Sequence, residues 1–246
     1  MPGISWRLIL GLGALPGLLL LPFQKSNRAQ QPEQTTTETT EEQQDTAPAP
    51  GLLQALQNRR HWRNIVGCAG GWFLFDITFY GNTLFSPTVL RDVFDVDGSV
   101  PVVGKTMKDN LCWQMTLLAL IGLPGYYVSV WLMDKWGRKN IQLQGFAFMA
   151  LLYAILAFWM EPMEDFPTIL LLVYGLTYFF SNFGPNSTTF ILPSETFPTE
   201  VRSTLNGVCA ACGKLGAVVG SSMFKPLVGA FGTQFVFFCC AVCAGL

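Results

Sequence analysis

The chain has 246 residues, of which 50% are hydrophobic and 13% charged, and its formal net charge is −1. Soluble domains carry about 25% charged residues, so this composition favours a protein that lies in a lipid bilayer. A net charge near zero gives no indication of a nucleic-acid partner. The seven cysteines lie in apolar stretches and His61 is the only histidine, so we expect no disulfide framework, no metal site, no cofactor and no enzyme activity.

The chain opens with an apolar segment at residues 5–23, which we expect to span the membrane. A signal peptide is the alternative, since Arg7 precedes a leucine-rich stretch, but no small-x-small cleavage site follows. Residues 25–63 are then polar and include QQPEQTTTETTEEQQDTAPAP, which predicts a disordered loop. The expected domains are a helix at 1–24, this loop at 25–63 and a helical bundle at 64–246.

Six further apolar segments predict an all-α membrane protein. They lie at residues 65–90, 111–133, 141–160, 168–192, 204–223 and 231–246, and the last one looks truncated at the chain end. If the 25–63 loop is cytosolic, nine lysines and arginines fall in inner loops and four in outer loops. This bias favours that orientation over its inverse.

Three polar side chains interrupt the second apolar segment. Trp72, Asp76 and Tyr80 are spaced i, i+4, i+8, which places them on one face of a helix. Ionisable residues inside a membrane are usually functional, so Asp76 is a candidate proton carrier. The alternative is a structural carboxylate that caps a helix break near Gly81 or pairs with a lysine.

A second charge lies in GVCAACGKLGAVVGSS, whose small residues allow close packing of helices. Lys214 in this segment must face a cavity or an anion. A structural ion pair with Asp76 is the alternative, and it is equally compatible with transport.

The sequence FSNFGPNSTTF predicts a break inside the segment 168–192, because Gly184-Pro185 interrupts the helical hydrogen bonds. Free backbone groups at this depth are tolerated beside a cavity or against packed protein. Asn186 is a candidate substrate contact at the break. For the hydroxyl residues that follow it, we favour the alternative that they only satisfy the kinked backbone.

Two motifs at the expected cytosolic helix ends place acids beside bases. They are DKWGRK at residues 134–139 and PSETFPTEVR at residues 193–202. Such pairs can hold helix ends together in one state and separate in another. The residues expected to form this cytosolic gate are Asp134, Gly137, Arg138, Glu195 and Arg202. The alternative is that the basic residues only set the topology.

These motifs carry a family resemblance. DKWGRK resembles the loop motif of the major facilitator superfamily, although Val130 stands where a glycine is usual, and residues 193–202 resemble the P-x-E-x-F-P-x-x-x-R signature of sugar-porter-like members. WFLFDITFYG, NFGPNSTTFILPSETFPTEVRST and GKLGA, in this order, resemble the eukaryotic phosphate:proton symporters of fungi and plants.

The resemblance implies a major facilitator helix bundle, of which this chain is the sixth helix, the central loop and the C-terminal six-helix half. It also implies proton-coupled import of inorganic phosphate across the plasma membrane. The implied phosphate-binding residues are Trp72, Asp76, Tyr80, Asn186 and Lys214, and Asp76 is the implied proton-coupling residue. A fragment of a longer transporter, or a half that needs a partner chain, is expected, because the N-terminal half supplies further contacts.

Two other functions remain open from the sequence. One is a related porter for a sugar, polyol or organic anion, although a neutral substrate has no need of Lys214. The other is a membrane receptor or interaction partner that does not transport.

Overall fold

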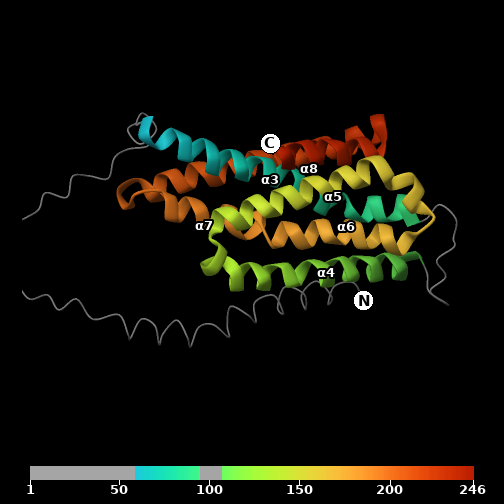
Figure 1. Ribbon diagram of the computed structural model, residues 1–246. Coiled ribbons are helices and arrows are strands. Elements are labelled where there is room, and N and C mark those ends of the chain that lie inside the picture. Colours follow the sequence, from blue (N-terminus) through green and yellow to red (C-terminus); the bar gives the residue numbers. More distant parts are fainter. Residues whose placement is uncertain (1–58, 95–106) are drawn as a thin grey trace, which may run out of the picture. The chain divides into compact units, whose positions relative to one another are not determined.

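The computed structural model describes residues 59–94 and 107–246, and within these ranges the chain is helical without β-strands (Figure 1). The helix expected at residues 5–23 and the loop up to residue 58 lie outside the described residues. The helices are α3 (Arg59–Phe94), α4 (Met107–Trp136), α5 (Arg138–Glu164), α6 (Pro167–Asn182), α7 (Pro185–Thr196) and α8 (Thr199–Gly245).

Helix α3 begins earlier than the sequence predicts. It starts at Arg59, inside the segment 25–63 that was expected to be a loop, and continues through Gly81 to Phe94. Arginine has good helix propensity, so the basic residues at 59–63 extend the helix by more than a turn. A helix break near Gly81, which the capping alternative for Asp76 required, is therefore wrong.

The predicted break in the segment 168–192 is confirmed. Helix α6 ends at Asn182 and α7 begins at Pro185, with Phe183 and Gly184 between them. Gly184 lies against α5, because an added Cβ would come within 2.6 Å of the Gly145 Cα atom. The absence of a side chain therefore lets the broken segment pack closely on α5.

Helix α8 folds back on itself at Gly232. This residue has φ of 84°, a conformation that favours glycine. The Phe224 ring lies against Gly81, while Asn82 contacts Cys240, although Phe224 and Cys240 would be about 24 Å apart along a straight helix. The two predicted segments 204–223 and 231–246 are therefore the two arms of α8.

The first arm of α8 packs on α3 through a row of glycines. A Cβ atom at Gly216 would lie 2.2 Å from the Phe73 carbonyl oxygen, and one at Gly220 would lie 2.2 Å from the Ile77 carbonyl oxygen. The two helices run parallel, since successive contacts advance along both chains. Small residues allow this close approach of backbones, as in other membrane helix pairs.

The surface of the described bundle is strongly apolar. Exposed large hydrophobic residues include Val130, Trp131, Leu143, Phe158 and Leu172. Four segments are long and apolar enough to cross a membrane, namely Trp113–Trp136, Arg138–Met163, Pro167–Thr196 and Thr199–Gly245. Helix α3 is not among them by composition, because it carries buried polar residues such as Asp76 and Asn82. An apolar surface of this kind is suited to lipid.

The glycine row predicts a specific sensitivity to added volume. Gly216→Ala forces α3 and α8 apart, and we expect a loss of about 1–3 kcal/mol in the free energy of unfolding. Thermal unfolding of the purified protein in detergent measures the change. Gly229→Ala in the same helix is the control, since nothing lies within 4 Å of its added Cβ. Equal melting temperatures for the two variants would contradict the packing described.

Candidate functional site

A lysine from α8 meets a carboxylate and a phenol from α3. The Lys214 Nζ atom lies 3.5 Å from Asp76 Oδ2 and donates a hydrogen bond of 2.9 Å to Tyr80 Oη. The same ammonium group lies 4.7 Å from the centre of the Tyr80 ring. The structure therefore brings Asp76, Tyr80 and Lys214 together in one cluster.

The two charges of this cluster differ in exposure. The Asp76 side chain is 4% exposed, whereas the Lys214 side chain is 63% exposed. Asp76 Oδ2 makes no hydrogen bond within the described residues. Its one ion pair there is the long contact with Lys214. A buried carboxylate without close hydrogen bonds is costly.

Trp72 adjoins the cluster one turn along α3. Its indole ring covers Gly213, where an added Cβ would come within 2.4 Å of the ring. The same ring also meets Phe190 of α7 edge to face, with ring centres 5.9 Å apart. The prediction that Trp72, Asp76 and Tyr80 share one helix face is confirmed, because all three meet the Gly213–Lys214 region of α8.

Asn186 takes part in a separate hydrogen-bond network. Its Nδ2 atom donates to Tyr126 Oη at 2.5 Å and to Asn182 Oδ1 at 2.8 Å. Asn182 Nδ2 in turn donates to the Gly122 carbonyl oxygen at 2.9 Å. No hydrogen bond or ion pair joins Asn186 to Asp76 or Lys214 among the described residues.

The hydroxyl residues after Asn186 bond to the backbone of the kink. Ser187 donates to the Asn182 carbonyl, Thr188 to the Gly184 carbonyl and Thr189 to the Pro185 carbonyl. The Gly184 carbonyl also accepts from the backbone N–H groups of Ser187 and Thr188, so the Thr188 hydroxyl adds to bonds that the start of α7 already makes. The preference for a structural role of these hydroxyls over substrate contact is consistent with these bonds.

Three residues near the candidate site were not singled out from the sequence. They are Tyr126, Asn182 and Phe190. Asn182 precedes the Gly-Pro break and is the last residue of α6. Its place directly before the break could therefore have identified it from the sequence. Tyr126 and Phe190 look like ordinary apolar-segment residues, and only the packing of α4 and α3 against the kink reveals them.

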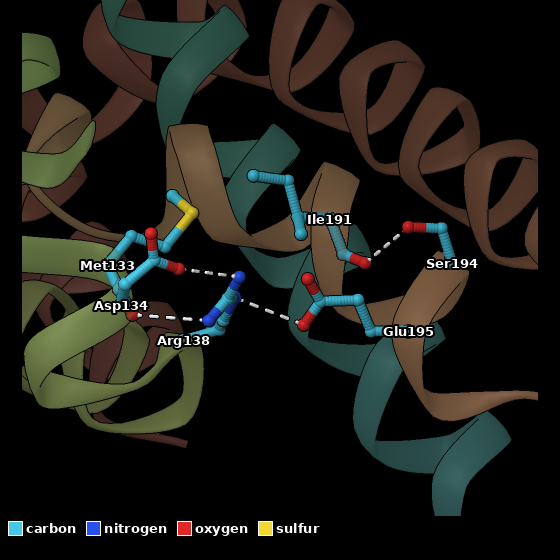
Figure 2. A network of polar contacts seen from close by, with 6 residues as sticks. All are labelled: Met133, Asp134, Arg138, Ile191, Ser194 and Glu195. Atoms are coloured by element: carbon cyan, nitrogen blue, oxygen red, sulfur yellow. Dashed lines mark hydrogen bonds and ion pairs between the residues drawn. The ribbon is translucent and has the colours of Figure 1, made fainter. Parts of the chain in front are cut away.

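At the expected cytosolic end, Arg138 joins two carboxylates from different helices. Its Nη2 atom lies 3.0 Å from Asp134 Oδ1 and its Nε atom lies 3.1 Å from Glu195 Oε2. Figure 2 shows the guanidinium lying between the two acids, with Met133 beside it. The guanidinium also donates to the Met133 carbonyl at 3.4 Å.

The remaining motif residues shape this contact. Gly137 has φ of 82° between α4 and α5, a conformation that favours glycine, and so lets the chain turn directly into α5. Arg202 donates to the Phe197 carbonyl at 3.1 Å and forms no ion pair among the described residues. Of the five predicted gate residues, the structure thus places Asp134, Arg138 and Glu195 in one ion-paired group.

The arrangement suits recognition of an anion more than bond chemistry. Lys214 supplies an exposed positive charge, Tyr80 a hydroxyl and Trp72 an indole face. Among the described residues, no group of three or more histidine, cysteine, aspartate or glutamate side chains could hold a metal ion.

Comparisons with known proteins agree with this fold. The profile of the family described as "Sugar (and other) transporter" matches residues 20–246. "Inorganic phosphate transporter 1-6" of Oryza sativa subsp. japonica is 38% identical over 253 residues, covering 90% of this chain and 46% of the relative. "Inorganic phosphate transporter 1-1" of Arabidopsis thaliana is 34% identical over 255 residues, covering 89% of this chain and 47% of the relative.

The chain spans about half the length of the curated relatives it matches. A transporter family, together with the apolar helices, indicates a multi-pass membrane protein of a transporter lineage rather than an enzyme. The extent of the profile match and the identity to these relatives show that the chain belongs to the sugar (and other) transporter family of the major facilitator superfamily.

Proposed function

We propose that this chain takes part in proton-coupled transport of inorganic phosphate. The observation that carries the proposal is the Asp76–Lys214 pair beside Tyr80, in a chain whose relatives are named inorganic phosphate transporters. Lys214 and Tyr80 would bind phosphate oxygens, and the Trp72 indole would flank the anion. Asp76 would carry the proton.

Charge balance links the proton to the anion. With no anion bound, ionised Asp76 neutralises Lys214 at 3.5 Å. When an anion reaches Lys214, the buried carboxylate loses its partner and faces a second negative charge, which is costly in a poorly solvated site. Protonation of Asp76 removes that cost, so the favoured loaded state holds both a proton and an anion.

A second bundle completes the proposed site. Lys214 is 63% exposed within the described residues, and the relatives are about twice as long as the matched region. We infer that an N-terminal half, in the same polypeptide or a partner chain, covers this lysine. Residues 1–24 would be the last helix of that half, 25–63 the cytosolic linker and 64–246 the C-terminal bundle. By the same resemblance, the protein would act in the plasma membrane.

A porter for another anion is the second candidate. The exposed ammonium of Lys214 attracts any tetrahedral oxyanion or carboxylate, whereas a sugar or polyol has no charge to pair with it. Competition for uptake by unlabelled sulfate and organic acids separates this candidate from the phosphate proposal.

Replacing the proposed proton carrier tests the coupling. In Asp76→Asn the amide cannot ionise, so we expect phosphate accumulation driven by an imposed pH gradient to fall by at least about tenfold. Phosphate binding should also lose the part of its pH dependence that Asp76 contributes, because Lys214 no longer has a competing carboxylate. Radiolabelled phosphate uptake, with the protein expressed from its complete coding sequence, measures both effects.

Asp165→Asn is the matched control, since Asp165 is exposed at the end of α5. It should behave as the unaltered protein does. Gradient-driven accumulation by Asp76→Asn at the rate of this control would rule out Asp76 as the coupling group.

The ion pairs around Arg138 form the proposed cytosolic gate. One guanidinium holds α7, through Glu195, to the end of α4, through Asp134. These side chains are partly exposed, so the link is weak enough to break during a change of state. Separation of Glu195 from Arg138 would open the helix ends on this side.

Arg138→Lys tests the gate, because an ammonium cannot make two directed contacts as the guanidinium fork does. We expect a stability loss of about 1 kcal/mol or less at low salt, which disappears at high salt as the ion pairs are screened. Thermal unfolding at two salt concentrations measures this. The neighbouring exposed Lys139→Arg, which has no ion pair among the described residues, is the control. A salt-independent loss would show that the contact is packing rather than ionic.

A further inference from the structure

The orientation of the Asn186 amide is fixed by a backbone carbonyl. The Gly122 carbonyl can only accept, so the Asn182 group that contacts it must be the NH₂ group. Asn182 therefore turns its Oδ1 atom toward Asn186, and Asn186 must donate with Nδ2. The second hydrogen of the same NH₂ group is taken by Tyr126 Oη.

Two polar groups of this network remain unused. Both N–H groups of Asn186 are occupied by bonds to Tyr126 and Asn182. Its Oδ1 atom has no hydrogen bond within the described residues, and the Tyr126 hydroxyl accepts from Asn186 while its own hydrogen stays free. The network thus presents one acceptor and one donor side by side.

The network lies at the depth of Asp76. Helices α3 and α7 run antiparallel, because Phe197, directly after α7, belongs to the same buried cluster as Ile65, whereas Phe190 meets Trp72 further along α3. Four residues forward along α3 lead from Trp72 to Asp76, and four residues back along α7 lead from Phe190 to Asn186. Each step is about 6 Å, so Asn186 and Asp76 reach a similar level on the two helices.

We propose that Asn186 Oδ1 accepts a hydrogen bond from a protonated oxygen of the substrate and so selects a protonated tetrahedral oxyanion. Tyr126 is the positioning residue, because it occupies the Asn186 N–H that would otherwise be free to bind an ionised oxygen. The proposal rests on the proposed phosphate function and adds the basis of selectivity.

The chemistry separates phosphate and arsenate from sulfate. Inorganic phosphate and arsenate carry at least one proton near neutral pH, so each can donate to Asn186 Oδ1. Sulfate carries none, and its oxygens would meet the amide oxygen with no hydrogen between them. A site built to pair with a substrate O–H discriminates strongly against an analogue that lacks it, because its own polar group is then left unpaired.

Tyr126→Phe removes the acceptor that holds the Asn186 amide. The amide can then turn an N–H toward the substrate, so we expect the inhibition constant of sulfate, relative to the KM for phosphate, to fall at least about tenfold. The relative inhibition by arsenate should stay within about twofold. Phosphate uptake by the protein expressed from its complete coding sequence, with each unlabelled anion as competitor, gives both ratios.

Tyr127→Phe is the matched control in the next position of α4. Tyr127 is 71% exposed and its hydroxyl has no hydrogen bond among the described residues. Perchlorate serves as a second competitor without a proton, since its single charge matches that of dihydrogen phosphate. Its inhibition should strengthen in Tyr126→Phe as that of sulfate does, which separates protonation from charge.

Asn186→Ala is the second variant and removes the acceptor itself. It should also relax the rejection of sulfate, and it keeps the test decisive if Tyr126→Phe does not reach the membrane. If the unaltered protein takes up no phosphate, the proposed function fails and the selectivity proposal falls with it. If it takes up phosphate and both variants keep the selectivity of the unaltered protein, the selectivity proposal alone is overturned.

Discussion

The close approach of α3 and α8 is the constraint on which the rest of the structure depends. Gly216 and Gly220 bring the two backbones near enough for Lys214 to reach Asp76 and Tyr80. Because this interface has no room for side chains at the glycines, the position of the lysine is set by rigid backbone contact. A charged pair in an apolar bundle requires such precision, since a misplaced charge in a poorly solvated setting costs several kcal/mol.

Polar groups near the pair are also held by bonds within the bundle. In the α6–α7 break, the hydroxyls of Thr188 and Thr189 bond to the kinked backbone, and Asn182 and Asn186 bond to each other. These polar side chains of the break are thus satisfied internally, as an apolar surrounding demands. Among the described residues, Asp76 Oδ2 is a buried atom without a hydrogen bond that the proposed mechanism uses, whereas Ser129 Oγ, Gln142 Oε1, Ser181 Oγ and Asn206 Oδ1 also lack one and have no part in it.

Much of this arrangement follows from the sequence. The apolar segments, the break at Gly184-Pro185 and the shared face of Trp72, Asp76 and Tyr80 depend on local periodicity and proline chemistry. The resemblance to phosphate symporters agrees with the family match. The contact between Lys214 and α3 joins residues far apart in sequence. The sequence around Lys214 alone therefore could not decide whether this lysine binds substrate or pairs with Asp76. The start of α3 and the amide orientation of Asn186 could not be predicted, because they depend on tertiary contacts and on Tyr126 of another helix.

The central claim is that the anion replaces Asp76 as the partner of Lys214 while Asp76 takes up a proton. The most direct measurement follows the pH of a weakly buffered solution as phosphate is added to the purified full-length protein in lipid nanodiscs, with Asp76→Asn as the reference for protons exchanged by phosphate itself. The account predicts that the unaltered protein takes up close to one more proton per bound phosphate than the reference does. Equal proton exchange by the two proteins, at equal phosphate binding, would contradict it.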